Sequence, residues 1–389
     1  MNWLRPVLAG RRYVSVGLVA LLAAAGCDEP QPPAPAADSA AAATATASTS
    51  AMANATASAS ASAAVADASA TAPAPDPAAP SLLTDKGLEI DDKSAPNGVL
   101  PAGAADKILK VADPPKVVLI DAGADPKSQL VYDVKPKSKQ RSTMKMDMTM
   151  RMSMAGQPQG APGGMALPQI EIPMDLAAGD AKTDKNEIPV TVTVADVKVN
   201  PKSDQEKQMA AMMGPQLTAM KGLKIKSIID PKGRARDVTV EAGKDSSPEA
   251  KQMIDQMKQS MEQMVAPLPD GDVGIGAKWQ VITRVSSGAD ILQWTTYTLV
   301  KRDGDKIELD GVVRQVAATP TLSGAGMPAG MSAEIKSFRS NGTGKTKLDL
   351  GALAPESGTG DVTSSLSVSA GPNSMQVDTS VKIGFAGKK

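Results

Sequence analysis

The sequence predicts an α+β fold: a largely antiparallel, curved sheet, open as a half barrel or closed as a barrel, with two inserted helices. From about Val117 onward, segments alternate apolar and polar residues with the period of two that is typical of strands. Turn sequences rich in Asp, Gly and Pro separate successive segments, which favours antiparallel hairpins. Because roughly twelve strands would strain one flat sheet, we expect the sheet to curl.

The first 26 residues have the features of a secretory signal peptide. Three arginines and no acidic residue accompany a short apolar run over residues 14–25. This run is shorter than the roughly 20 apolar residues that a membrane-spanning helix needs. It ends at Ala24-Ala25-Gly26-Cys27, which contains the single cysteine of the chain.

That ending resembles the lipobox of bacterial lipoproteins, in which the cysteine becomes the lipidated first residue of the mature chain. The resemblance implies that Cys27 carries a diacylglyceryl group and a fatty acid such as palmitate. Several acyl chains anchor a protein stably, whereas one chain binds a membrane only marginally. We therefore expect a lipid-anchored protein of the bacterial cell envelope, with the inner or outer membrane left open.

A tether and a transitional segment are expected before the folded domain. Residues 27–80 consist mainly of Ala, Ser, Thr and Pro and contain no aromatic side chain. Such a stretch cannot bury enough surface to offset its ordering entropy, so it predicts a disordered tether. In residues 81–115, Gly and Pro interrupt short apolar pieces. The β-rich domain is expected over residues 116–389.

In the first half of the domain, alternation predicts four strands, over residues 117–121, 128–134, 141–154 and 188–199. Residues 156–168 are rich in Gly and Pro and predict a loop. A slip in the alternation at Ala195-Asp196 indicates a bulge. A helix is predicted over residues 203–220, interrupted at Gly214-Pro215 because proline removes a backbone donor.

The second half predicts further strands, over residues 222–229, 234–241, 278–286, 291–301, 306–317, 333–340, 343–350, 362–369 and 374–385. The sequences at 230–233 and 303–305 are turn sequences, and Asn341-Gly342 predicts a hairpin. The second helix is predicted over residues 248–265, with Ser247 as its cap and a proline at its first position.

Methionines occupy every second position of the strand predicted over residues 141–154, and these are Met144, Met146, Met148, Met150, Met152 and Met154. Since side chains alternate faces along a strand, all six are expected on one face. The second predicted helix adds Met253, Met257 and Met261 at the spacing of one helical face. We expect this helix to lie across the methionine strand, so these nine residues are the candidate ligand-facing set.

Three interpretations of these methionines stay open. They could form an ordinary core, because the chain has few aromatic residues to supply bulk. They could line a pliable cavity for a lipid or another hydrophobic small molecule. They could also bind Cu(I), as in a methionine-rich periplasmic copper protein, since thioethers favour that ion. Alternate strand residues lie about 6.6 Å apart, however, so neighbouring thioethers would have to lean together.

The composition excludes several classes of function. Histidine is absent and cysteine occurs once, which excludes histidine-dependent triads, Cys/His zinc sites, iron–sulfur ligation and a disulfide within one chain. The 42 basic and 42 acidic residues balance, so no basic field exists to bind nucleic acid. We predict no catalytic residue, no cofactor and no metal site, with an uncharacterised hydrolase as a further alternative.

The run Leu268–Trp279 reads Leu-Pro-Asp-Gly-Asp-Val-Gly-Ile-Gly-Ala-Lys-Trp. It resembles a family of uncharacterised bacterial envelope lipoproteins in which a Pro-rich turn leads to Val-Gly-x-Gly-x-x-Trp and a strand. The resemblance covers roughly residues 128–350 and brings no catalytic residue with it. A lipobox followed by a β-rich domain is also similar, in architecture, to half-barrel lipoprotein-localisation and lipid-carrier proteins. Neither resemblance establishes a function. From the sequence as a whole, we expect a non-catalytic protein that binds a hydrophobic ligand or interacts with another envelope protein.

Overall fold

The computed structural model describes residues 82–154, 165–241, 266–287, 289–322, 332–370 and 373–388. The predicted signal peptide, the lipidation site Cys27 and the tether lie outside these residues. The helix predicted over residues 248–265, with Met253, Met257 and Met261, also lies outside them.

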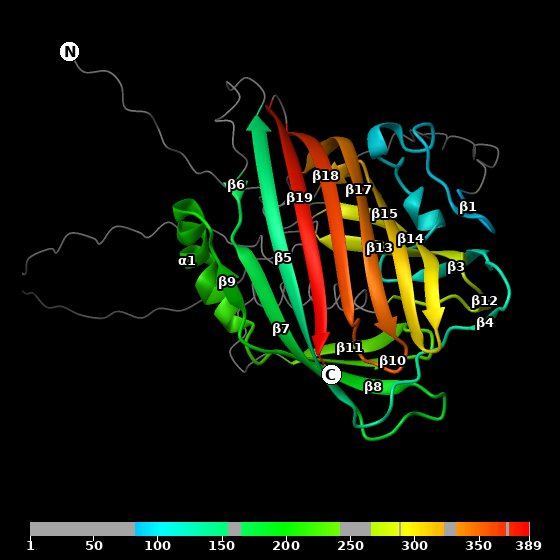
Figure 1. Cartoon of the computed structure of the whole chain (residues 1–389). Helices are drawn as coiled ribbons and strands as arrows, with labels where there is room; N and C mark the ends of the chain where they lie inside the picture. Colours follow the sequence, from blue (N-terminus) through cyan, green and yellow to red (C-terminus); the bar gives the residue numbers. More distant parts are fainter. Residues whose placement is uncertain are drawn as a thin grey trace, which may run out of the picture. The chain divides into compact units, whose positions relative to one another are not determined.

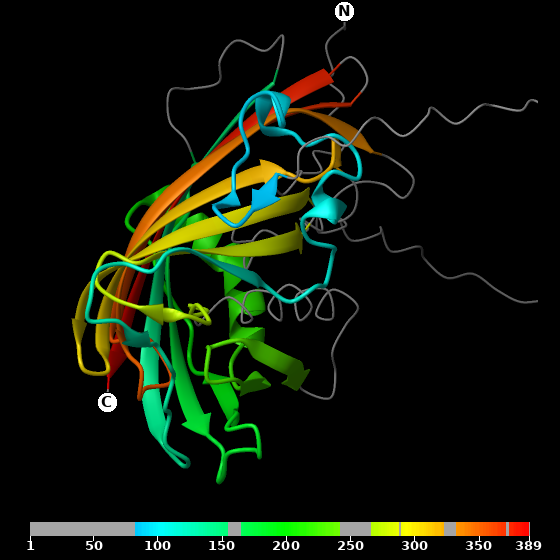
Figure 2. The same ribbon diagram turned by 90° about the vertical axis from the view of Figure 1, so that its right-hand side faces the viewer.

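Antiparallel sheet dominates the described residues, as the alternation predicts. One sheet runs in the order β11-β10-β8-β7-β5-β19-β18-β17-β15-β14-β13-β3. These strands are β3 (Lys116–Asp121), β5 (Lys139–Met154), β7 (Gln169–Ala178), β8 (Ile188–Val194), β10 (Lys224–Ile229), β11 (Ala235–Glu241), β13 (Lys278–Ser287), β14 (Ala289–Asp303), β15 (Lys306–Ala317), β17 (Ala333–Asp349), β18 (Ser357–Ala370) and β19 (Asn373–Lys388). The sheet is curved and open, because no pairing joins β11 to β3 (Figures 1 and 2).

Short strands complete the ladder. β6 (Met165–Ala166), β9 (Lys198–Asn200) and β16 (Thr321–Leu322) pair with β5, β7 and β17, respectively. Two separate pairs are β1 (Leu83–Thr84) with β2 (Gly87–Leu88), and β4 (Ser128–Gln129) with β12 (Asp272–Val273).

The last strand of the chain joins the two halves of the sheet. β19 lies between β5 and β18, and it pairs with β5 from Met375 opposite Met154 to Lys388 opposite Arg141. Figure 1 shows the long strands β5, β19, β18 and β17 side by side. The methionine strand is therefore an interior strand of the sheet, with β19 on one side and β7 on the other.

Both faces of the sheet are covered over part of their area. Residues 82–115 include the short 3-10 helices η1 (Pro96–Gly98) and η2 (Ala105–Lys107), and they pack on β13, β14 and β15. On the other side, helix α1 (Asp204–Ala219) buries Met213 and Leu217 against β7, β8 and β10. The Ser203 side chain accepts a hydrogen bond from the backbone N–H of Glu206 and so caps α1.

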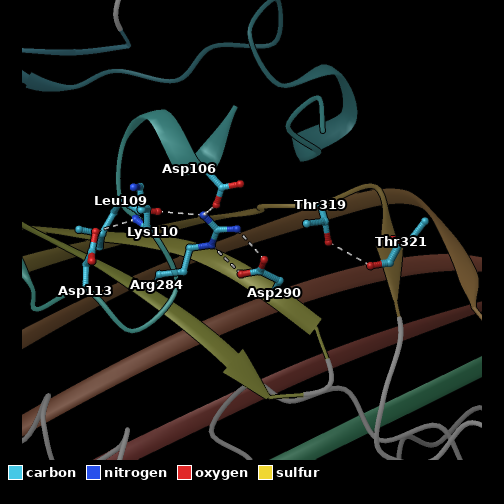
Figure 3. A network of polar contacts seen from close by, with 8 residues as sticks. All are labelled: Asp106, Leu109, Lys110, Asp113, Arg284, Asp290, Thr319 and Thr321. Atoms are coloured by element: carbon cyan, nitrogen blue, oxygen red, sulfur yellow. Dashed lines mark hydrogen bonds and ion pairs between the residues drawn. The ribbon is translucent and has the colours of Figure 1, made fainter. Parts of the chain in front are cut away.

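Arg284 ties the segment of residues 82–115 to the sheet (Figure 3). Its side chain is only 3% exposed and donates to both carboxylate oxygens of Asp290, to Asp106 and to the carbonyl oxygen of Leu109. The segment expected to be transitional thus supplies part of a buried core, since Leu88, Leu100 and other apolar side chains cluster with Trp294.

The structure differs from the sequence predictions at four places. Residues 333–349 form the single strand β17, so the hairpin predicted at Asn341-Gly342 is wrong. Gly342 pairs with Val313 of β15 and with Val362 of β18, and a strand with partners on both sides does not need to turn. Only residues 128–129 of the predicted strand 128–134 are extended in a ladder.

The other two differences involve proline. Strand β7 was not predicted, although residues 169–176 alternate strictly and lie next to β5. Helix α1 continues through Pro215, where an interruption was predicted. In both cases tertiary packing outweighs the local cost of proline: β7 carries four buried apolar side chains, and α1 buries Leu217 two residues after Pro215.

Candidate functional site

The methionines of β5 lie on one face of the strand, which we call the methionine face. Across the β5–β19 ladder, Met146 lies opposite Ile383, Met148 opposite Val381 and Met152 opposite Val377. Val377 and Val381 are fully buried, so the neighbouring strand extends the apolar surface of the methionines.

Exposure on the methionine face rises along β5. The Met146 side chain is 2% exposed, Met148 and Met150 are half-buried, and Met152 is 38% exposed. At the lower end, Met144 packs against the same cluster that contains Met213 of α1. The methionine face is thus ordinary core at one end and accessible at the other. The predicted cover of this face, residues 248–265, lies outside the described residues.

A row of polar side chains crosses the methionine face from β13 to β19. Successive register pairs place these residues side by side: Thr283, Gln293, Gln315, Ser340, Ser364 and Thr379, the last opposite Met150. Gln315 donates to Gln293 at 2.6 Å and accepts from the Ser340 hydroxyl at 2.5 Å.

The row separates two apolar clusters of the same face. Phe338 and Leu366 belong to the cluster on one side of it, and Trp279 and Leu309 to the cluster on the other. The buried hydroxyl of Thr283 has no hydrogen-bond partner within the described part of the chain. Buried polar groups are almost always paired, so an unpartnered hydroxyl at this position is unusual.

The run Val-Gly-x-Gly-x-x-Trp forms the entry to β13. A Cβ atom on Gly274 would lie 1.7 Å from the carbonyl oxygen of Ala124, so only glycine fits there. Trp279 is fully buried, donates from its indole N–H to the carbonyl oxygen of Pro267 at 2.9 Å, and stacks on Tyr297. This motif therefore has a structural role, as an anchor of the sheet.

Burial perturbs the two tyrosines near this anchor. Desolvation raises the pKa of Tyr297 to about 12, and it raises the pKa of Tyr132 further still. Tyr132 donates from its hydroxyl to the carbonyl oxygen of Ala266 at 3.2 Å. Both phenols thus stay neutral at ordinary pH.

Residues 250–351 match a family of unknown function, DUF6263. The match spans β12 through β17 and includes Gly274 and Trp279, the motif just described. None of the curated proteins matches the chain. The family match supplies no activity, ligand or partner.

The described residues contain neither a cluster of metal-binding side chains nor a membrane-spanning helix. Over those ranges, no three or more His, Cys, Asp or Glu side chains lie close enough together to hold a metal ion. Within the same part of the chain, no helix has the length and apolar character needed to cross a membrane.

Proposed function

We propose that this protein is a non-catalytic, lipid-anchored protein of the bacterial cell envelope, and that its methionine face binds a hydrophobic ligand with a polar head, such as a lipid. The observation that supports this proposal best is the exposure of Met152 at the end of a run of methionines on an open sheet. Methionine is flexible and polarisable, so such a surface can repack around acyl chains of different shape.

The polar row gives the methionine face an amphipathic character. A lipid offers one polar head and long apolar chains, and the row lies directly beside Met150. We propose that the chains contact Met148, Met150 and Met152, while the head accepts or donates hydrogen bonds at the row. The hydroxyl of Thr379, opposite Met150, is the group of the row to which such a head would lie nearest.

The membrane anchor is proposed from the sequence. Cys27 follows a short apolar segment and ends a lipobox-like motif, and the Ala-rich tether would hold the folded domain away from the membrane. An anchored carrier with its binding face free of the bilayer would suit transfer of a lipid between the membrane and a partner.

Native mass spectrometry of the full chain, purified gently from an envelope extract, tests this proposal. We expect adducts of acyl-lipid mass that are lost on denaturation, beyond the mass of the covalent anchor. Met150→Gln and Met152→Gln should each reduce the adduct, because they place an amide on the apolar surface. Ser153→Gln is the matched control, since it changes a neighbouring residue that points to the opposite face.

Each outcome decides the proposal. A bare mass that stays unchanged after phosphatidylglycerol vesicles are added would contradict it, as would equal adduct loss in the Ser153→Gln control. If the protein retains copper after Cu(I) is added and carries no acyl adduct, the methionine face binds Cu(I) and not a lipid, and the proposal is wrong. Loss of adducts in the methionine variants alone would support it.

A further inference from the structure

The face of the sheet opposite the methionine face, which we call the polar face, carries the odd-numbered residues of β5. Over the lower part of this face, charged side chains pair across neighbouring strands. The pairs are Arg141–Asp175, Lys145–Glu171, Lys382–Asp361, Lys345–Asp310 and Lys347–Glu308, at 2.7 to 3.8 Å. Each of them joins residues directly opposite in the register. Opposite charges in such positions are the expected pattern for an exposed sheet face.

This pattern stops at the upper part of the polar face, where β5, β19, β18 and β17 form an open groove of about 560 Å³. The lining residues are Thr149, Arg151, Arg339, Asn341, Thr363, Ser364, Ser365, Asp378, Thr379 and Ser380. Eight of the ten alternate onto the polar face, whereas Ser364 and Thr379 belong to the row on the methionine face. The volume lies within the range of small-ligand sites, roughly 300–1,000 Å³.

Two arginines lie at the ends of one row across the groove. Arg151 is opposite Asp378, Asp378 is opposite Ser365, and Ser365 is opposite Arg339. With strands about 4.8 Å apart, the two arginine Cα atoms are separated by about 14 Å, and both side chains can reach inward over the groove.

Neither guanidinium has a partner among the described residues. No ion pair or hydrogen bond joins Arg151 or Arg339 to a carboxylate, although Asp378 lies directly across from Arg151. Asp378 instead accepts from the side-chain amide of Gln376, at 3.1 and 3.2 Å. Two guanidinium groups therefore lie over one groove without a carboxylate partner in the described part of the chain.

The groove chemistry limits what could bind. Guanidinium groups bond carboxylate and phosphate oxygens in pairs, so the two ends of the groove suit anionic groups. Between them lie hydroxyls, the Asn341 amide and the Asp378 carboxylate. The Asp378 carboxylate would repel a plain polyanion but would accept hydrogen bonds from hydroxyl groups. We propose that this groove binds an acidic saccharide: a short chain of sugars bearing carboxylate or phosphate groups.

This inference does not depend on the proposed lipid function, because eight of the ten lining residues point to the face opposite the methionines. An acidic saccharide bound there would place a glycan of the envelope beside the sheet. Failure of lipid binding would leave this inference intact, and the reverse also holds.

Isothermal titration of the full chain at low salt tests it, with trigalacturonate as the acidic probe and maltotriose as the neutral one. We expect binding of trigalacturonate alone. Arg151→Gln and Arg339→Gln should each weaken it about tenfold or more, which is the usual cost of one charge-assisted contact. Arg141→Gln is the matched control on the same strand and face, since its guanidinium is already held by Asp175.

Asp378→Ala separates a saccharide site from a plain anion site. If Asp378 accepts sugar hydroxyls, this variant weakens binding of trigalacturonate. If the groove binds only anions, removal of the negative charge strengthens binding of both trigalacturonate and inorganic phosphate, and the proposal is overturned. Glucose 6-phosphate in place of trigalacturonate distinguishes phosphate from carboxylate as the anionic group.

Two further results would also overturn the proposal: equal affinity for maltotriose and trigalacturonate, or an equal loss in Arg141→Gln. Thermal melting of each variant shows that it is folded. The changed side chains of Arg151, Arg339 and Arg141 are all exposed, so we expect unchanged melting temperatures.

Discussion

Arg284 and Asp290 form a bidentate pair across the β13–β14 hairpin, with both N···O distances at 2.7 Å. Hydrogen bonding to Asp290 is the main reason why the pKa of Arg284 is raised above its ordinary value. The remaining amino group of the same guanidinium donates to Asp106 and to the carbonyl oxygen of Leu109, at 2.8 Å each. One side chain thus links the hairpin to the segment that covers it.

Arg284→Ala is expected to lower the free energy of unfolding by about 3 kcal/mol, because it leaves the Asp290 carboxylate without its partner in a largely buried site. Chemical denaturation of both proteins measures this change. The control is Arg141→Ala, whose exposed pair with Asp175 is expected to be worth no more than about 1 kcal/mol. Similar losses in the two variants would show that Arg284 is not a buried anchor.

Gly274→Ala is expected to destabilise the protein by about 3 kcal/mol, because the new Cβ would meet the backbone oxygen of Ala124 at 1.7 Å. Gly384→Ala is the matched control, since a Cβ at that position of β19 would have no heavy atom within 4 Å. It should be neutral, or stabilising by about 0.5 kcal/mol. Urea unfolding of the two variants decides between these expectations, and a neutral Gly274→Ala would contradict the close approach.

Methionine oxidation by hydrogen peroxide should follow the gradient of exposure on the methionine face. Peptide mass spectrometry should find sulfoxide on Met152 well before Met146, because only the former is accessible to the oxidant. A bound lipid should slow oxidation of Met152 and leave that of the exposed Met212 on α1 unchanged. Equal rates at Met146 and Met152 would show that the gradient does not exist in solution.

Alkaline pH should destabilise the fold through Tyr132 and Tyr297. Burial raises the pKa of Tyr297 to about 12 in the folded state, whereas an unfolded tyrosine ionises near pH 10. The folded protein therefore holds its phenolic protons more tightly, and this contribution to stability is complete below pH 10 and falls as the pH rises toward 12.

Ultraviolet absorbance of tyrosinate, recorded together with circular dichroism during a pH titration, measures this effect. Tyr132 and Tyr297 should ionise together with the loss of sheet structure. Ionisation of both residues near pH 10 with the fold intact would contradict their raised pKa values.

The local pattern of the sequence predicts most strands of this fold. Strict alternation marks β5 and β8, because a half-buried strand needs side chains of opposite polarity on its two faces. It also places the methionines of β5 on one face. Local sequence signals mislead where pairing with neighbouring strands determines the backbone conformation. Asn341-Gly342 has the sequence of a turn, yet it pairs with β15 on one side and β18 on the other.

The candidate sites could be predicted only in part. Met144 to Met152 are visible in the sequence as a periodic set, whereas the groove with Arg151 and Arg339 is not, because β5 is distant in the chain from the strands β17, β18 and β19 beside which it lies. The polar row through Gln315 is hidden for the same reason. Hydroxyl and amide side chains on six strands become one row only when the register is known.

By itself, the sequence determined the antiparallel β-rich class, the common face of the methionines and the absence of histidine chemistry, since these depend on composition and on the period of a single strand. The tertiary structure decided that β19 inserts beside β5, that the sheet stays open, and that Arg151 and Arg339 face the same groove. Strand order and register are set by contacts between residues far apart in the chain, so a local sequence pattern cannot specify them.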